Sequence, residues 1–172
     1  FNTVITIRGV GYETNQNAIA TPSVSYHLDG IYVASPYSLQ TDFLDLERVE
    51  VLRGPQGTLF GQNSTGGAIN VVTKAPTTDE TYGSADLTLG DHGLFKIRAG
   101  VNRPLSDNLA MRASFISNIR DGFTENLTNG QDLDDADSFS ARVRLKYEPS
   151  DNFRADFTAQ IFDEDRNGAA QK

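Results

Sequence analysis

Apolar and polar residues alternate with a period of two through the second half of the chain. In residues 138–147 one face takes Phe139, Ala141, Val143, Leu145 and Tyr147, and the other takes serines, arginines and a lysine. Such alternation predicts β-strands with one apolar and one polar face. Strands of this kind are expected at residues 84–89, 95–102, 109–115, 138–147 and 153–161. Their expected connections are 91–93, 103–107, 121–137 and 148–152.

Two kinds of protein contain strands with this pattern. One is a soluble antiparallel sandwich that buries the apolar face, and the other is a membrane barrel that turns the apolar face to lipid. Aromatic residues at the strand ends favour the barrel, with Tyr147 and Phe153 at one rim and Phe123 and Phe139 at the other. The connections also differ in length from one end of the strands to the other. The pattern therefore favours a barrel wall and leaves the sandwich open.

The first half of the chain predicts shorter strands joined by special turns. Strands are expected at residues 4–7, 23–28, 31–33, 49–52 and 68–73. Asp29-Gly30 supplies the positive φ angles of a two-residue hairpin turn. Residues 54–61 contain too many glycines for a regular element, so we expect a compact loop with one helical turn over 58–60. A helix of ordinary length is not supported anywhere in the sequence.

Composition excludes several classes of function. The 172 residues contain 15 basic and 23 acidic side chains, a formal charge of −8, which argues against nucleic-acid binding. The absence of cysteine excludes a disulfide scaffold and a thiolate metal site. No apolar run is long enough for a membrane helix, but barrel strands average to an ordinary hydropathy. The chain starts at Phe1 without a targeting signal, and we expect it to be a processed product or a fragment.

Residues 45–61, DLERVEVLRGPQGTLFG, and residues 66–76, GGAINVVTKAP, form the most specific motif in the chain. This motif resembles the plug domain of TonB-dependent outer-membrane receptors, and residues 7–9 and 26–33 precede it in the order that the family shows. The resemblance implies an all-β or α+β fold. Residues 1–76 would be the C-terminal portion of the plug. Residues 77–172 would be about five opening strands of a 22-stranded transmembrane barrel.

The same resemblance implies the function and the partners. We expect active transport of a scarce, bulky nutrient, such as a ferric siderophore, cobalamin or a saccharide, across the outer membrane of a Gram-negative bacterium. The plug would fill the barrel lumen, and the tight turns would face the periplasm. The TonB–ExbB–ExbD complex would supply energy through a TonB box that this sequence lacks. Outer-membrane lipid is the other expected partner, and no cofactor or nucleic acid is expected. A passive porin and a signalling receptor are the open alternatives.

The resemblance also assigns a latch between plug and barrel. Arg8 and Arg53 match the two plug arginines that, in the family, pair with glutamates of the barrel wall, and Glu50 joins them as the third latch candidate. A guanidinium in a partly dry space needs carboxylate or carbonyl partners. The alternative is an ordinary salt bridge on the plug surface or within the plug, with Glu47 and Glu50 as the nearest carboxylates.

Cargo contacts are expected from plug segments that face outward. The candidates are Asn15, Gln16, Tyr32 and Tyr37, each of which could equally be a solvated loop residue. Basic residues on the polar faces of the later strands would favour an anionic cargo, although these positions also face the plug. They are Lys96, Arg98, Arg112, Arg142, Arg144 and Arg154.

The plug glycines have a structural explanation. Gly54, Gly57, Gly61, Gly66 and Gly67, together with Gly9, permit sharp turns and close packing. A phosphate-binding loop is excluded because Ala68 and Ile69 stand where the Lys and Ser/Thr of that motif should follow.

Two further features suggest no chemistry of their own. Residues 121–137 carry six acidic side chains and no basic one, which fits a solvated loop better than a divalent-cation site. His27 and His92 are isolated, and the sequence has neither a cysteine nor a Gly-x-Ser-x-Gly nucleophile motif, so we expect neither a catalytic nor a metal site.

Overall fold

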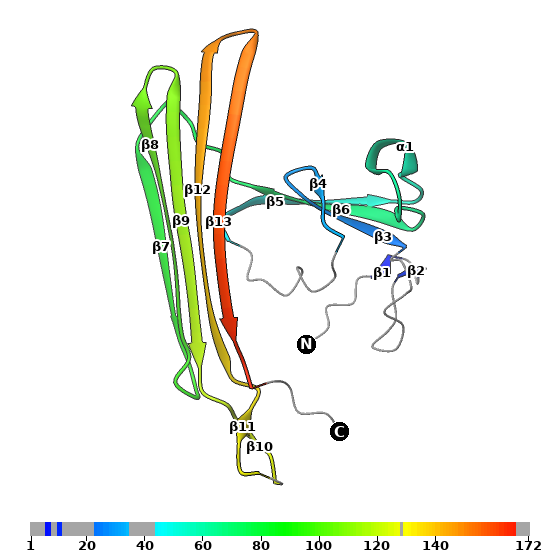
Figure 1. Ribbon diagram of the computed structural model, residues 1–172, viewed down its shortest axis with the longest axis vertical. Helices are drawn as coiled ribbons and strands as arrows, with labels where there is room; N and C mark the ends of the chain where they lie inside the picture. Colours follow the sequence, from blue (N-terminus) through cyan, green and yellow to red (C-terminus); the bar gives the residue numbers. More distant parts are fainter. Residues whose placement is uncertain (1–5, 8–9, 12–22, 35–43, 128, 168–172) are drawn as a thin grey trace. The chain divides into compact units, whose positions relative to one another are not determined.

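The structure is a computed structural model that describes residues 6–7, 10–11, 23–34, 44–127 and 129–167. The chain divides into two compact units, Phe1–Lys74 and Ala75–Lys172, which we describe separately (Figure 1). Each unit is built on its own β-sheet.

The N-terminal unit contains a mixed four-stranded sheet with the order β4-β3-β6-β5, which we call the N-terminal sheet. Its strands are β3 (Val24–Leu28), β4 (Ile31–Tyr32), β5 (Leu46–Arg53) and β6 (Gly67–Thr73). Strands β3 and β6 run parallel, whereas β3–β4 and β5–β6 are antiparallel. A separate short ladder joins β1 (Thr6–Ile7) to β2 (Val10–Gly11). The predicted hairpin is confirmed, with positive φ at Asp29 and Gly30.

The loop between β5 and β6 contains the expected helical turn, α1 (Gly57–Phe60). Among the residues that the structure describes, no helix has the length and apolar character needed to cross a membrane.

The C-terminal unit contains a five-stranded antiparallel sheet with the order β13-β12-β9-β8-β7, which we call the wall. Its strands are β7 (Tyr82–Leu89), β8 (Phe95–Ser106), β9 (Leu109–Arg120), β12 (Ala136–Ser150) and β13 (Phe153–Asp165). All five predicted strands are present, and each is longer than the sequence suggested. The wall is open at β7 and β13, the two strands that form its edges.

Three of the predicted connections were placed wrongly. Residues 103–106 belong to β8. Pro104 fits within the strand because it lies next to a register shift, where its missing N–H group is tolerated. Residues 148–150 likewise extend β12 past a register shift. The loop 121–137 is partly ordered as a hairpin of β10 (Thr124–Glu125) and β11 (Asp132–Leu133), and β12 begins within it.

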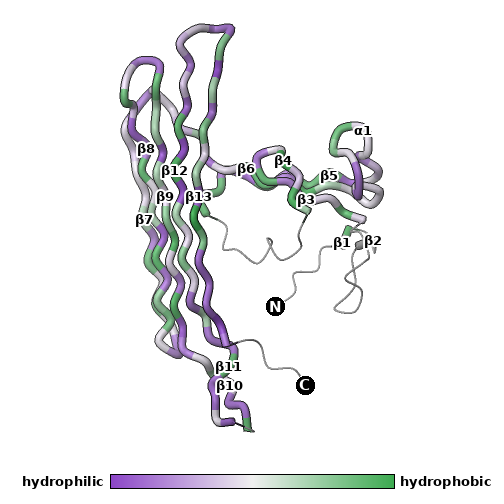
Figure 2. The backbone as a smooth tube through the Cα atoms, viewed as in Figure 1, coloured by the Kyte–Doolittle hydropathy of each residue, from purple (hydrophilic) through white to green (hydrophobic). Residues whose placement is uncertain are grey.

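The wall shows the predicted alternation, but its pattern of burial is the reverse of that in a soluble protein. Apolar side chains on one face are exposed, as for Val143 and Phe157. The polar face is the more buried one in the inner strands β9 and β12, whereas nearly all side chains of the edge strands β7 and β13 are exposed. The buried polar residues of the wall include Asn102, Arg112, Ser114, Ser138, Ser140 and Arg142. Figure 2 shows hydrophobic and hydrophilic residues alternating along these strands. A sheet with this distribution has its apolar surface available to an apolar surrounding.

Candidate functional site

The hairpin tip of the N-terminal sheet is held by the end of β6. The carboxylate of Asp29 accepts hydrogen bonds from the backbone N–H and the hydroxyl of Thr73, at 2.8 and 2.7 Å. The N–H of Gly30 donates to Oδ1 of Asn70 at 3.1 Å. The sequence indicated Asp29 as a turn residue only. Its role as an acceptor depends on the parallel pairing of β3 with β6, which no local pattern predicts.

A row of side chains crosses one face of this sheet at Tyr32, His27, Asn70 and Glu50, which are partners in the strand register. The amide of Asn70 donates to Glu50 at 2.8 Å, and Nε of Arg48 donates to the same carboxylate at 2.8 Å. The bond from Asn70, followed by that from Arg48, holds the pKa of the Glu50 carboxyl below its usual range. Glu50 is therefore engaged within its own sheet.

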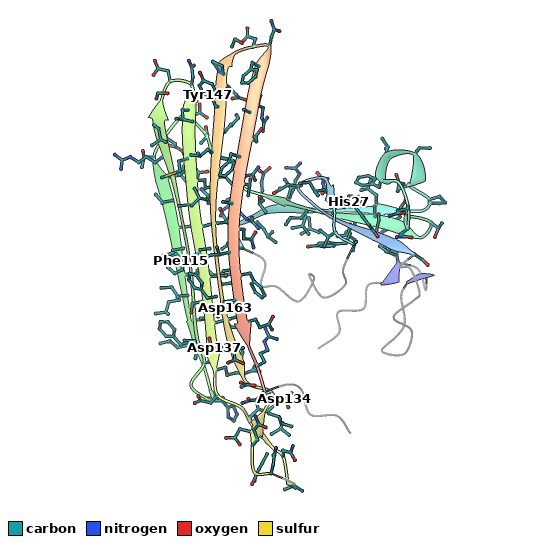
Figure 3. The ribbon with its side chains drawn as sticks, in the orientation of Figure 1. His27, Phe115, Asp134, Asp137, Tyr147 and Asp163 are labelled. Atoms are coloured by element: carbon teal, nitrogen blue, oxygen red, sulfur yellow. The ribbon has the colours of Figure 1, made fainter. Side chains whose placement is uncertain are left out.

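His27 lies in the interior of the N-terminal unit, with only 3% of its surface exposed (Figure 3). Its Nε2 atom is 3.2 Å from the hydroxyl of Ser25, and its ring packs edge-on against Phe60 with centroids 4.8 Å apart. Burial lowers the pKa of His27, so the neutral imidazole is favoured at neutral pH. The geometry agrees with a structural histidine that links α1 to the sheet.

The latch candidates divide between described and undescribed residues. Arg53 ends β5 with an exposed side chain, and within the described part of the chain its guanidinium has no carboxylate within 4.0 Å. The carboxylates proposed as its alternative partners, Glu47 and Glu50, both pair with Arg48 instead. Arg8 lies outside the described residues.

The glycine-rich loop is held by backbone hydrogen bonds, one within the loop and one to the residue that precedes β3. Gln56 N–H donates to the Ser64 carbonyl at 2.9 Å, and Gly66 N–H donates to the Ser23 carbonyl at 2.8 Å. Positive φ angles at Gly54, Gly61 and Gly67 explain three of the glycines.

Gly67 also has no room for a side chain. A Cβ atom there would overlap the Leu52 carbonyl oxygen and lie 2.8 Å from Ile7. Gly57, by contrast, has open space around it, so nothing in the structure requires glycine at that position. Gly9 is outside the described residues.

The cargo candidates are mostly outside the described part of the chain, where Asn15, Gln16 and Tyr37 fall. Tyr32 is half-buried, and its hydroxyl accepts a hydrogen bond from the amide of Asn63 at 2.8 Å. Its ring lies 5.6 Å from that of His27. The described contacts of Tyr32 are thus made within the N-terminal unit.

The polar face of the wall is rich in basic side chains arranged in register. Arg112 of β9 lies opposite Arg144 of β12 in the strand register, and Arg142 is the neighbouring residue of β12 on the same face. Arg142 donates from Nε and Nη2 to the amide oxygen of Gln160, at 2.9 and 2.8 Å. Arg154 pairs with Asp156 beside the turn between β12 and β13.

The acidic segment between β9 and β12 forms a short hairpin in which Asp121, Glu125, Asp132 and Asp137 are exposed and Asp134 is buried. The carboxylate of Asp134 accepts from the hydroxyl of Thr124 at 2.6 Å, and its backbone carbonyl accepts from Arg120 at 2.8 Å. Within the described ranges, no group of three or more His, Cys, Asp or Glu is placed to hold a metal ion.

Aromatic residues lie at both ends of the wall. The rings of Tyr147 and Phe153 lie 6.4 Å apart beside the turn between β12 and β13. Phe123 contacts His92 and Arg120 where β9 ends.

Comparison with known proteins identifies the motif. A family model described as the TonB-dependent Receptor Plug Domain matches residues 1–68. The pesticin receptor of Yersinia pestis is 30% identical over 150 residues, which cover 86% of this chain and 21% of the receptor. The catecholate siderophore receptor Fiu of Escherichia coli K12 is 32% identical over 106 residues, covering 59% of this chain and 14% of Fiu. The chain therefore spans about a fifth or less of the length of these curated relatives.

Solved structures agree with this assignment. The ferric yersiniabactin uptake receptor FyuA of Yersinia pestis superimposes with a TM-score of 0.69 at 27% identity, covering 81% of this chain and 22% of FyuA. The ferripyoverdine receptor of Pseudomonas aeruginosa, at 23% identity and a TM-score of 0.67, shares the fold over 81% of this chain and 19% of that receptor. Because the plug model, the relatives and the mostly stranded fold all point the same way, the chain belongs to the TonB-dependent outer-membrane receptors and carries their plug and the first strands of their barrel.

Proposed function

We propose that this chain serves in the energised uptake of a scarce, bulky nutrient across the bacterial outer membrane. In this proposal residues 1–76 form the plug and residues 77–172 open the barrel wall. The observation that carries it is the inverted wall, with an exposed apolar face and a more buried polar face. A lipid-facing exterior and a polar lumen require this distribution. The N-terminal unit, with its own hydrogen-bonded sheet, would fill that lumen.

A ferric siderophore is the proposed class of cargo. The support comes from relatives whose names describe uptake of ferric yersiniabactin and recognition of catecholate siderophores. Basic residues also outnumber acidic ones in the register rows of the polar wall face. The basic members are Lys96, Arg98, Arg112, Arg120, Arg142, Arg144 and Lys146, and the acidic members are Asp86, Asp156 and Glu164. Such a surface favours an anionic cargo over a neutral one.

The latch proposal rests on Arg53 and Arg8, with glutamates of the rest of the barrel as their partners. Support comes from the absence of a carboxylate partner for Arg53 among the described residues, because the carboxylates of Glu47 and Glu50 pair with Arg48. Glu50 contributes to this arrangement from within the plug, because it ties Arg48 and Asn70 together. A pairing of this kind can hold the plug and still release it, since each ion pair is worth little when water reaches it.

Asn15, Gln16, Tyr32 and Tyr37 are proposed as cargo contacts, with the TonB–ExbB–ExbD complex and outer-membrane lipid as partners. Tyr32 would act through its ring and its O–H donor, because its hydroxyl oxygen already accepts a hydrogen bond from Asn63.

A growth assay tests the proposed function. A strain lacking the receptor would be supplied with a ferric siderophore, cobalamin or a saccharide as the limiting nutrient, with and without a functional TonB. We expect loss of growth on the ferric siderophore alone, and the same loss when TonB is removed. Uptake that persists without TonB would contradict the proposal and indicate a passive porin. Unchanged growth on all three nutrients would also contradict it.

A further inference from the structure

The chain passes from one unit to the other at Lys74 and Ala75. Polar side chains hold the chain on both sides of this crossing, the half-buried Asp29 on one side and the buried Asn102 on the other. On the N-terminal side, Asp29 holds Thr73 through its backbone N–H and its hydroxyl, at 2.8 and 2.7 Å. We call this pair of bonds the Asp29 clamp. It fixes the last residue of β6 to the hairpin tip of the same sheet.

On the C-terminal side, Asn102 of β8 holds the chain immediately after Pro76. Its Oδ1 atom accepts from Thr77 N–H at 3.0 Å, and its Nδ2 atom donates to the carbonyls of Thr77 and Glu80, at 2.9 and 2.7 Å. We call these three bonds the Asn102 clamp. Asn102 has no exposed surface, and its amide uses one acceptor and two donor bonds on a single short stretch of backbone.

The chemistry of this clamp is specific. A buried amide must have hydrogen-bond partners, and an apolar residue of similar size would fill the same volume without them. All three of these side-chain hydrogen bonds go to the backbone of Thr77 and Glu80 rather than to the neighbouring strands of the wall. The Asn102 side chain thus fixes the backbone of residues 77–80 and makes no described hydrogen bond between strands of the wall.

We propose that Asn102 is a positioning residue for the plug, which fixes the point at which the chain leaves the wall. With the Asp29 clamp it restricts the hinge between the units to Lys74, Ala75 and Pro76. The hinge is short and stiff, because Pro76 has a fixed φ and restricts Ala75 to extended conformations. Four residue steps span at most roughly 14 Å, so Thr73 and Thr77 always lie within that distance of each other. The two clamps attach these two residues to the hairpin tip and to β8. This inference rests on the proposed plug function.

Hydrogen exchange on the whole receptor in lipid bilayers tests the clamp directly, because the Thr77 amide is one of its donors. In Asn102→Ala we expect the protection of Thr77 to fall by about tenfold, the effect of losing one buried hydrogen bond. Protection of Thr73, in the Asp29 clamp, and of β7 and β8 should stay unchanged. Thr77→Val is the matched control, because it removes the hydroxyl bonded to Asp79 and keeps the backbone bonds to Asn102.

Asn102→Asp separates the clamp from general packing. The introduced carboxylate keeps the shape of the amide but turns an acceptor toward the carbonyls of Thr77 and Glu80. When protonated, it can donate to one of them. The loss of Thr77 protection should therefore be several-fold larger at pH 8 than near pH 4, where an aspartic acid ordinarily gains its proton, whereas the loss in Asn102→Ala should not depend on pH.

Distances between spin labels test the positioning role itself. Labels would replace exposed Leu59 in α1 and exposed Asp107 between β8 and β9, in a chain that has no natural cysteine. A broader distance distribution in Asn102→Ala than in the parent receptor would support the proposal. It would be overturned by an unchanged Thr77 protection, by a loss that extends through β7 and β8, or by an unchanged distance distribution. None of these results depends on cargo or TonB, so failure of the proposed function would show separately in the growth assay.

Discussion

The two units of this chain bury opposite kinds of side chain. In the N-terminal sheet, β3 is buried on both faces, with Val24 and Tyr26 on one side and Ser25 and His27 on the other. In the wall, Val143, Phe157 and Ile161 are exposed while serines and arginines of the opposite face are buried. The N-terminal unit supplies its own core, whereas the wall depends on an apolar surrounding. This difference is what a plug inside a membrane barrel requires.

The units also differ in how their sequences specify structure. The wall repeats the alternation of apolar and polar residues over long strands, so many substitutions of similar polarity fit any given position. The N-terminal sheet depends on particular contacts, such as Asp29 with Thr73 and Asn70 with Glu50. Substitutions should therefore be judged by polarity and face in the wall and by individual contacts in the plug.

The largest expected effect is a charge on the apolar face of the wall. Val143→Arg should destabilise the whole receptor by about 2–4 kcal/mol in a bilayer, because a lipid-facing cation near the midplane is costly. The control is Ser84→Arg, which places the same group on the polar face beside Gly100. The free energy of unfolding in lipid vesicles, measured by denaturant titration, checks this. Equal losses of unfolding free energy in both variants would contradict the assignment of one face to lipid and the other to the lumen.

A smaller loss is expected from a side chain at Gly67. Gly67→Ala should cost about 1–3 kcal/mol, since φ is +148° and the Cβ atom would meet the Leu52 carbonyl. Hydrogen-exchange protection of the β5–β6 ladder would report it. Gly57→Ala, at a position with open space and no positive φ, should be neutral or slightly stabilising. A loss of similar size at Gly57 would show that the loop is sensitive to any change.

The buried histidine predicts a pH dependence confined to the plug. Burial lowers the pKa of His27 in the folded state, while the unfolded chain binds a proton at about pH 6.5. The unfolded state therefore holds more protons as the pH falls below that value, and stability decreases until the folded-state pKa is passed. Protection of β3 and β6 should decrease from pH 7.5 to pH 5, and His27→Gln should abolish that dependence. A decrease of equal size in His27→Gln would assign it to other groups.

The smallest expected effect concerns Glu50. Its pKa is lowered in the folded state, so its contribution to stability is present above the ordinary value of about 4.3 and is lost as the pH falls through the folded-state pKa. Glu50→Gln should be less stable than the parent at pH 7 and equal to it at strongly acidic pH. Glu47→Gln, which leaves the bond from Asn70 intact, should have the weaker effect at pH 7. The reverse order would show that Arg48 depends mainly on Glu47.

Much of the wall could be predicted because its signal is local. Alternation in residues 138–147 and 153–161 identified β12 and β13, and Asp29-Gly30 identified the β3–β4 turn. Extension of β8 through Pro104 was missed because a proline ordinarily ends a strand, and its tolerance depends on a register shift against β9.

Contacts between distant segments could not be read from local patterns. Asn102 with Thr77 and Asp29 with Thr73 join residues 25 and 44 positions apart. The partners depend on strand order and register, and neither Asn102 nor Thr77 belongs to any sequence motif. The latch role of Arg8 and Arg53, in contrast, is a prediction that rests only on resemblance to a family.

The most direct test of the account is a cysteine scan along β12 in the whole receptor, because this chain has no cysteine of its own. Spin labels at residues 141–147 would be exposed in turn to oxygen, which partitions into lipid, and to a water-soluble nickel complex. We predict that labels at 141, 143, 145 and 147 are accessible to oxygen and that labels at 142, 144 and 146 are not. Absence of this alternation, or access of the nickel complex to both faces, would contradict a wall that faces lipid and would favour a soluble sandwich.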